Sequence, residues 1–332
     1  MNVLRDLLRD LPAVDEGAAA GVRDRASQVL RPSGALQRLD DIAVHVAGWH
    51  GTDRPRIDRP AVIVFAADHG VAAGGVSAYP SEVTAAMLAA VQAGRATINA
   101  VAAAVGATVT VHDVGVGDPT GDIRTESALT TGRFDDTVRA AVAAVDDAVA
   151  SGADLIVLGE LGIGNTTAAA AVAAALLGGG TERWVGRGTG VDDDGLARKH
   201  DAVARATERV QGETDPLEVL RSVGGAELVA MAAAAVQARH HRVPVVIDGY
   251  IATAALLPVH EAVPGALDHC VAGHRSPEPG HRLLLERLAL DPLLDLGMRL
   301  GEGSGAVAAI PLVRAACAGV VDVATFGEWF GE

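Results

Sequence analysis

The stretch that decides the fold is "AVIVFAADHG", Ala61 to Gly70. It opens with seven apolar residues in a row, which is typical of a parallel strand buried on both faces. A strand with one face in water alternates apolar and polar residues instead. The run ends in Asp68, His69 and Gly70, so polar side chains follow the strand directly. Similar units recur along the chain as "ATVTVHDVGVG", "DLIVLGELGIGN" and "VPVVIDGYIAT".

Ala-rich segments of helical character alternate with these four apolar stretches, which predicts an α/β fold of the Rossmann-like kind, a parallel sheet flanked by helices. We expect residues 1–50 to be N-terminal helices and residues 301–332 a helical segment. Together they are predicted to form a small subdomain beside a large α/β domain of residues 51–300. Ligands of parallel sheets bind at the carboxyl ends of the strands. The strand-end polar residues are Asp68, His69, Asp113, Glu160 and Asp248.

Composition narrows the class of partner. The chain has 332 residues, 49% of them hydrophobic and 3% aromatic, and a formal net charge of −15. A phosphate backbone is a poor partner for such a charge, and few aromatic rings are available to stack on bases, so nucleic acid is not expected. The N-terminus has charges every few residues, unlike a signal peptide, and the Ala-rich run 168–177 is too short to span a bilayer. With two cysteines, these features predict a cytoplasmic protein without a membrane segment.

The third strand runs into a glycine-rich turn, "GELGIGNTT", which contains Gly162, Gly164, Asn165 and Thr166. Glycines allow close backbone approach and a helix start offers free N–H groups, so this turn is either an anion cradle or simply a tight turn with a Thr cap. A dinucleotide site is not supported, because no second strand ends in an acid about 20 residues further on. No P-loop lysine is present either.

A second glycine turn follows in "WVGRGTGVDDDGLARKH", with Gly188 and, further on, Lys199. Its three aspartates, residues 192–194, fit the acidic start of a helix better than a Mg²⁺ site. A phosphate near the two turns would favour one cation such as Lys199. The segment "HRSPEPGHR", residues 274–282, is either a loop that closes over an anion or a solvated connector. No HxxxH, HExxH or HxH spacing and no Gly-x-Ser-x-Gly elbow occurs, so metal hydrolysis and serine catalysis lack support.

Near the C-terminus, "RLGEGSGAVAAIP" places one carboxylate, Glu302, between two glycines and ahead of an apolar run. Such an acid either stabilises a helix start or acts as a base in a pocket. Burial would raise its pKa and the helix start would lower it, and sequence alone leaves that balance open.

Eight segments taken together resemble the family of nicotinate-nucleotide:dimethylbenzimidazole phosphoribosyltransferases of cobalamin synthesis. In chain order, from about residue 31 to residue 326, they are "PSGALQRLD", "FAADHGVAAGGVSAYPSEVT", "GELGIGNTTAAAA", "VGRGTGVDDDGLARK", "VGGAELVAMA", "VPVVIDGYIATAA", "HRSPEPGH" and "DLGMRLGEGSGA". The resemblance implies an enzyme that moves the 5-phosphoribosyl group from nicotinate mononucleotide to 5,6-dimethylbenzimidazole. The products are α-ribazole 5′-phosphate and nicotinate. It also implies a homodimer that needs no metal and no organic cofactor.

The resemblance assigns roles by matching positions. Glu302 looks like the base that takes the benzimidazole proton, and Glu160 like a carboxylate that stabilises positive charge on the ribose. The predicted substrate-binding residues are Tyr79, Met87 and Leu300 for the acceptor base, together with Asp68, Gly162, Asn165, Thr166, Gly188, Lys199, Ser276, Gly303, Ser304 and Gly305. Some relatives carry smaller or more polar residues at the positions of Tyr79 and Met87, which leaves the acceptor open.

The sequence leaves three alternatives to this activity open. The acceptor is another azole, a purine or a phenol; or the chain is a non-catalytic nucleotide binder; or it is a conventional phosphoribosyltransferase that uses phosphoribosyl pyrophosphate. Retention of Glu160, Lys199 and Glu302 together disfavours a binder. The last alternative lacks paired acids directly before a Thr-Gly phosphate turn.

Overall fold

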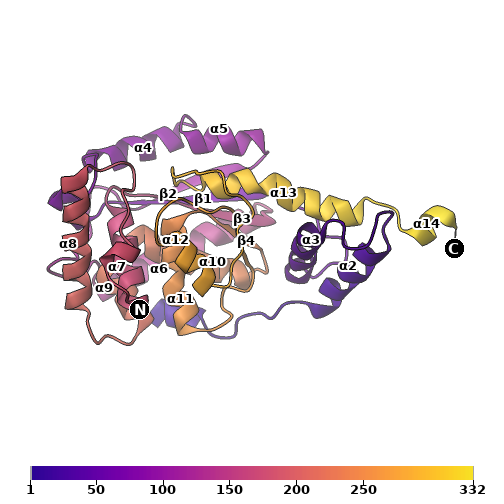
Figure 1. Ribbon diagram of the computed structural model, residues 1–332, viewed down its shortest axis with the longest axis horizontal. Coiled ribbons are helices and arrows are strands. Elements are labelled where there is room, and N and C mark those ends of the chain that lie inside the picture. The colour runs from indigo at the N-terminus through magenta and orange to yellow at the C-terminus, as the bar shows by residue number, and fades with distance from the viewer. Residues whose placement is uncertain (1, 332) are drawn as a thin grey trace.

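A computed structural model describes residues 2–331 of the protein, and its centre is a five-stranded sheet with the order β2-β1-β3-β4-β5 (Figure 1). Every pair of neighbouring strands is parallel. The strands are β1 (Pro60–Ala67), β2 (Thr108–Gly115), β3 (Leu155–Leu161), β4 (Val245–Ile247) and β5 (Cys270–Ala272). The predicted α/β fold class is therefore confirmed, and the four apolar stretches are its first four strands.

Helices connect and cover these strands. Their bounds are α1 (Asn2–Leu7), α2 (Glu16–Gln28), α3 (Gln37–His50), α4 (Glu82–Gln92), α5 (Thr97–Ala104), α6 (Thr131–Ala150), α7 (Asn165–Leu177), α8 (Asp193–Arg209), α9 (Pro216–Val223), α10 (Ala226–His240), α11 (Tyr250–Ala262), α12 (His281–Arg287), α13 (Ser304–Val321) and α14 (Phe326–Phe330). Two short 3₁₀ turns, Gly70–Gly74 and Thr181–Arg183, complete the described elements.

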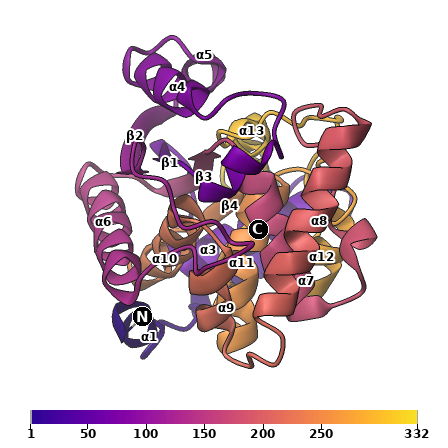
Figure 2. The same ribbon diagram turned by 90° about the vertical axis from the view of Figure 1, so that its left-hand side faces the viewer.

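The apolar run of β1 is uninterrupted because helices cover both of its faces (Figure 2). Ile63 and Phe65 point into one core, which also contains residues of α6, α7, α10 and α11. Val62 and Val64 point into a second core, built with α3, α5 and α13. All eight β1 residues are buried. At the sheet edge, β2 has only exposed and half-buried positions, and its sequence carries polar residues in the middle.

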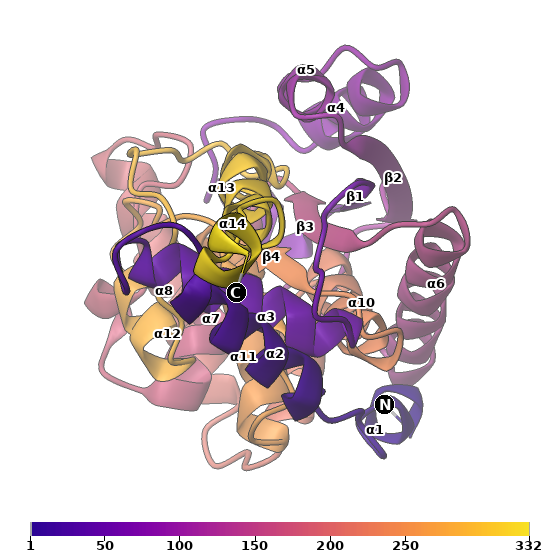
Figure 3. The same ribbon diagram turned by 90° about the vertical axis from the view of Figure 1, so that its right-hand side faces the viewer.

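Segments far apart in sequence meet beside the sheet, where α2, α3 and the second half of α13 lie together (Figure 3). Arg25 of α2 pairs with Glu328 of α14, and a bridge joins Val29 to Thr325. By contrast, α1 packs against α6 and α10 of the sheet-bearing part. The domain boundaries at residues 50/51 and 300/301 remain a prediction, and their outer limits, Met1 and Glu332, lie outside the described residues.

One described helix, α13 (Ser304–Val321), is long and apolar enough to cross a membrane by those criteria alone. Since 61% of that window is buried inside the protein, α13 is accounted for as a core helix. Its partners are α3 and α5 and the ends of β3 and β4.

Candidate active site

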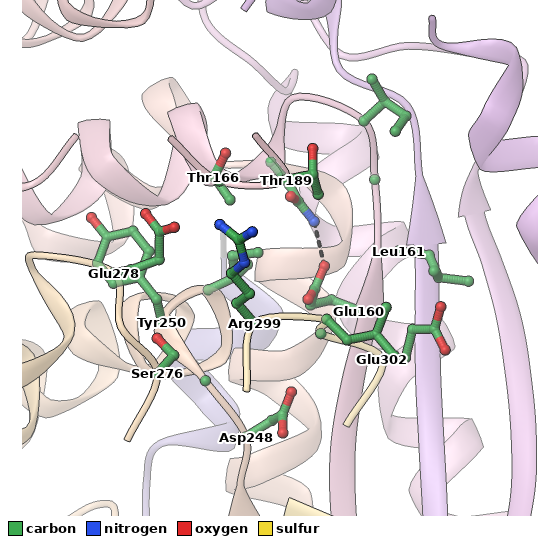
Figure 4. Close-up of a pocket in the computed structure, with 18 of the residues that line it drawn as sticks. Glu160, Leu161, Thr166, Thr189, Asp248, Tyr250, Ser276, Glu278, Arg299 and Glu302 are labelled. Atoms are coloured by element: carbon green, nitrogen blue, oxygen red, sulfur yellow. Dashed lines mark hydrogen bonds between the residues drawn. The ribbon is translucent and has the colours of Figure 1, made fainter. Parts of the chain in front are cut away.

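A cavity of about 500 Å³ opens at the carboxyl ends of β3, β4 and β5 (Figure 4). Its wall comes from six parts of the chain: the start of α4 with the residues before it, the β3–α7 turn, the turn at Gly188, the segment after β4, the segment after β5, and the loop before α13. The lining residues are Tyr79, Val83, Met87, Glu160, Leu161, Gly162, Ile163, Asn165, Thr166, Gly188, Thr189, Asp248, Gly249, Tyr250, Ile251, His274, Ser276, Glu278, Arg299, Leu300, Gly301 and Glu302.

Glu302 lies in a strained turn. Gly301, Glu302 and Gly303 all have left-handed backbones, with φ of 88°, 63° and 86°. For glycine this conformation costs nothing, but for glutamate it costs on the order of 1 kcal/mol or more, and such strain gathers at functional sites. The turn also lies directly on β3, where a Cβ at Gly159 would come within 2.4 Å of the Glu302 carbonyl oxygen. The two glycine neighbours and the bare strand beneath are what allow Glu302 to occupy this position.

The Glu302 side chain is buried, with 3% of its surface exposed. Burial raises the pKa of Glu302, a backbone amide contact from Ile98 at the start of α5 opposes the shift, and the negative charge of Asp248 adds to it. Figure 4 shows the carboxylate turned away from Arg299, and its Oε2 has no hydrogen-bond partner within residues 2–331. Burial therefore decides the balance that the sequence left open, and the carboxyl group is held as a better proton acceptor than an exposed glutamate.

Glu160 is the second buried carboxylate of the cavity. It sits near the end of β3 and accepts a hydrogen bond from Nδ2 of Asn165, the first residue of α7. Burial raises the pKa of Glu160 well above the usual range, and the charges of Asp248 and Glu227 raise it further. A cation bound nearby would favour the ionised form. A positive charge that enters the cavity would therefore be neutralised by the ionised carboxyl group of Glu160.

Lys199 lies behind the wall and does not line the cavity. It is 1% exposed, and Nζ donates at 2.8 Å to the hydroxyl of Thr166, which lines the cavity. Burial lowers the pKa of Lys199 to about 8, against the opposing charge of Glu278. Gly188 has a φ of 53°, and a Cβ there would reach 3.2 Å from Nζ. An anion beside Thr166 would restore the full charge of this lysine.

The segment 274–282 is only partly a loop, since α12 begins at His281. His281 is buried, its Nδ1 accepts from the Ser276 amide at 2.9 Å, and burial lowers its pKa to about 3. Arg275 forms an ion pair with Asp295, and Arg282 forms one with Glu286. These two cations therefore already have partners other than an anion in the cavity. Ser276 contributes differently, because its hydroxyl is buried at the cavity wall without a partner within residues 2–331.

An apolar wall closes the other side of the cavity. Met87 is half-buried on α4, while Tyr79 and Leu300 are about half exposed at the rim, at 51% and 50%. Such a wall fits a flat, uncharged ring that has both apolar edges and one polar atom.

The structure brings ten of the predicted site residues to one cavity. They are Tyr79, Met87, Glu160, Gly162, Asn165, Thr166, Gly188, Ser276, Leu300 and Glu302. Gly303, Ser304 and Gly305 lie behind it at the start of α13, where the Ser304 amide is already bonded to the Gly301 carbonyl. Asp68 lines a neighbouring cavity of about 540 Å³ at the ends of β1 and β2. The roles assigned to all of these residues stay predictions.

Several lining residues escaped the predicted set. The sequence predicts Asp248 only as a strand-end acid and His274 only as part of the segment 274–282. Arg299 brings a cation to the cavity, and Tyr250 and Glu278 add polar groups. The only sequence signal for them was their place directly after predicted strands or within the eight family segments. Within residues 2–331, no three His, Cys, Asp or Glu side chains are grouped as a metal ion would require.

A parallel sheet with a largely apolar cavity and buried carboxylates at its carboxyl edge defines an α/β enzyme that works on small molecules. The family described as DBI_PRT, phosphoribosyltransferase, matches residues 11–329. Since the match spans nearly the whole chain, the protein belongs to this phosphoribosyltransferase family.

Curated relatives are similar over their full length. A nicotinate-nucleotide–dimethylbenzimidazole phosphoribosyltransferase of Ruegeria pomeroyi is 49% identical, and the alignment covers 98% of this chain and 95% of the relative. One with the same name from Mesorhizobium japonicum is 48% identical, with 99% and 97% covered. The crystal structure of CobT from Thermus thermophilus superposes with a TM-score of 0.91 at 45% identity, covering 95% of this chain and 98% of that one.

Proposed function

We propose that the protein transfers the 5-phosphoribosyl group of nicotinate mononucleotide to 5,6-dimethylbenzimidazole, which gives α-ribazole 5′-phosphate and nicotinate for the assembly of the cobalamin nucleotide loop. The observation that carries the proposal is Glu302, a buried carboxylate with a raised pKa in a strained turn of the cavity. Relatives named for this reaction, 47% to 49% identical to the chain, support the choice of substrates.

The chemistry needs a base rather than an acid. The C1′–N bond to the pyridinium breaks with its electron pair going to the ring nitrogen, so nicotinate leaves without protonation. A benzimidazole nitrogen forms the new bond to C1′ from the opposite face, and its partner N–H becomes acidic. Glu302 takes this proton, and its raised pKa suits the task near neutral pH. Glu160 stabilises the positive charge that develops on the ribose.

We place the donor's phosphate against the cavity lining that includes Gly162, Thr166, Gly188 and Ser276. The support is the buried ammonium of Lys199 behind Thr166 and the unpartnered hydroxyl of Ser276. The net charge of −15 makes such local donors necessary, because the protein as a whole repels an anion. Arg299 at the rim provides a further cation.

The acceptor base packs on Tyr79, Met87 and Leu300 in this proposal. Another azole, a purine or a phenol would use the same wall, so competition among acceptors decides between them. Equal amounts of each acceptor are offered with one donor, and the product ratio gives the preference. A wide margin for dimethylbenzimidazole supports the proposed acceptor.

The direct test is an incubation of purified protein with nicotinate mononucleotide and 5,6-dimethylbenzimidazole in metal-free buffer, followed by chromatography and mass analysis. We expect nicotinate release matched one to one by a benzimidazole ribotide. Donor left intact with every azole and phenol would overturn the transfer and favour a binding protein. A requirement for Mg²⁺ and pyrophosphate release would instead indicate a conventional phosphoribosyltransferase.

We further propose a homodimer in the cytoplasm. Both cysteines are free and buried, as a reducing compartment allows. On α14, Phe326, Trp329 and Phe330 are 47% to 67% exposed, which is unusual for aromatic side chains in a chain that has so few. Light scattering should give twice the chain mass of 33.7 kDa, and a monomer mass at micromolar concentration would contradict the dimer.

A further inference from the structure

Helix α13 begins without a cap from its own neighbours. Its N-cap residue is Gly303, which has no side chain and a φ of 86°. The first-turn amide of Ala306 instead donates to Oδ1 of Asp248 at 2.9 Å, inside the protein. Asp248 follows β4 and is 58 residues away in sequence. A carboxylate from a strand end thus performs the capping that a Ser, Thr, Asp or Asn usually performs locally.

A histidine from a third segment holds the same carboxylate. His274, after β5, has its Nε2 at 3.4 Å from Asp248 Oδ1, and both side chains are almost fully buried. The His274 ring fills the space above Gly305 of α13, where a Cβ would come within 2.1 Å of it. The start of α13 is therefore clamped between the ends of β4 and β5.

The clamped residues, Gly305 and Ala306, lie three and four residues after Glu302, so the clamp fixes one end of the strained turn. The other side of the turn rests on Gly159 of β3. A left-handed glutamate persists only where its surroundings impose that backbone. If the start of α13 were free to move, the turn would relax, and the carboxylate would leave its place in the cavity.

We propose that Asp248, steadied by His274, is a positioning residue that caps α13 across the fold and thereby holds Glu302 at the reacting atoms. The inference rests on the proposed transfer, for which Glu302 is the base. A strand-end acid thus places the base through the start of a helix, and the same acid tunes the charge of the cavity.

Asp248 affects the ionisation of the two catalytic carboxyl groups because it lines the same cavity. The negative charge of Asp248 raises the pKa of Glu302, and it also raises the pKa of Glu160. From α5, the group that faces Glu302 is the backbone amide of Ile98. The other ionisable side chains of the cavity are Tyr79, Glu160, Tyr250, His274, Glu278 and Arg299.

The test compares Asp248→Asn and Asp248→Ala with a matched control, Asp322→Asn. Asp322 is the exposed C-cap residue at the other end of α13 and pairs with Arg56. Values of kcat and of KM for both substrates are measured against pH. In Asp248→Ala the cap is lost, and kcat should fall about 10²-fold, the usual cost of a misplaced catalytic group, with donor KM changed less than about threefold.

Asp248→Asn keeps an oxygen that accepts from the Ala306 amide but removes the charge. We expect a milder loss of kcat and an acid limb of kcat/KM that moves to lower pH, because a neighbouring negative charge is gone. A purely structural role would lower the amount of folded enzyme without moving this limb. If Asp248→Ala does not fold, His274→Asn weakens the same clamp and should lower kcat in the same sense.

Hydrogen–deuterium exchange gives a readout that needs no turnover. The amides of residues 303–307 should exchange faster in Asp248→Ala and at the wild-type rate in Asp322→Asn. Unchanged exchange, an unmoved acid limb in Asp248→Asn, or a loss that appears mainly in donor KM would overturn the positioning role while wild-type turnover still supports the transfer. A wild-type protein without turnover would overturn the transfer and, with it, the role assigned to Asp248.

Discussion

At the residue scale, the cavity contains carboxyl groups in buried positions, where burial destabilises their ionised forms. Glu160 and Glu302 are both buried, and burial is the first cause of the raised pKa of each. A surface position would be cheaper for either side chain, and a glycine would suit the backbone of Glu302 better. Positions at which stability is given up in this way are typical of functional sites.

Glu302→Gln tests the base directly. The amide keeps the size of the side chain and cannot accept the proton, so kcat should fall by about 10² to 10⁴ while circular dichroism shows an unchanged fold. In the wild type, kcat/KM should rise with pH along an acid limb above pH 4.5, because the pKa of Glu302 is raised from that value and only the ionised base acts. Turnover within about threefold of wild type would remove Glu302 from the mechanism.

Lys199 should produce an alkaline limb in the pH profile of donor kcat/KM. Burial lowers its pKa to about 8, so the free enzyme should lose this cation, and donor kcat/KM should fall, as the pH rises past about 8. Lys199→Gln should abolish that alkaline limb and raise donor KM by about tenfold or more, the usual loss for a hydrogen bond to a charged group. Arg198, the residue of α8 that precedes Lys199, donates to the Gly75 carbonyl, and its replacement by Gln is a matched control. An alkaline limb that survives in Lys199→Gln would show that another group titrates.

At the element scale, the first four strands could be predicted because each lies in a run of apolar or β-branched residues that ends in glycine or a polar residue. The acids 192–194 were also interpreted correctly, since Asp192 caps α8 through the Gly195 amide. The fourth and fifth strands, Val245–Ile247 and Cys270–Ala272, each have only three residues. The fourth ends the apolar run 243–247, whereas His269 and Gly273 flank the fifth, so no apolar run signals it. Pro258 and Pro311 lie inside α11 and α13, where local rules would end a helix, and tertiary packing overrides those rules.

Gly159→Ala is the test at this scale, because at Gly159 strand β3 lies directly against the backbone of the Glu302 turn. The added methyl would meet the Glu302 carbonyl at 2.4 Å, and no rotamer change can relieve a contact with backbone. We expect a loss of stability of about 1–3 kcal/mol in chemical denaturation and at least a tenfold drop in kcat. Gly132→Ala, in α6 with open space around it, is the control and should stabilise by about 0.5–1 kcal/mol. Equal kcat in both variants would argue against a close fit under Glu302.

At the scale of the whole molecule, the edge of the sheet that holds the site was predictable, but the membership of the cavity was not. Its walls come from residues 79–87, 160–166, 188–189, 248–251, 274–278 and 299–302, and sequence spacing does not say which strand ends share one space. Asp68 shows the difficulty, because the strand that precedes it borders β2 on one side and β3 on the other, and the acid faces the β2 side.

The net charge of −15 gives a prediction that involves no single residue. Repulsion should slow the approach of the anionic donor at low salt. At 0.1 M salt the Debye length is about 10 Å, so charges further apart than this are largely screened. Raising ionic strength from about 0.01 to 0.15 M should increase donor kcat/KM a few-fold, while the value for the uncharged acceptor stays level and serves as the internal control. A decrease with salt would mean that Arg299 and Lys199 govern the approach instead.

Helix α13 starts at the cavity and ends among α2 and α3, a run of 18 residues or about 27 Å. Each residue of a helix turns the chain by about 100°. Deleting or inserting one residue in the middle of α13 would rotate one half of the helix against the other by about 100°. Either the face that meets α3 would turn away from α3, or the Glu302 turn would rotate out of its place at the cavity. Its length is therefore fixed from both ends, and in evolution α13 should accept substitutions far more readily than changes in length.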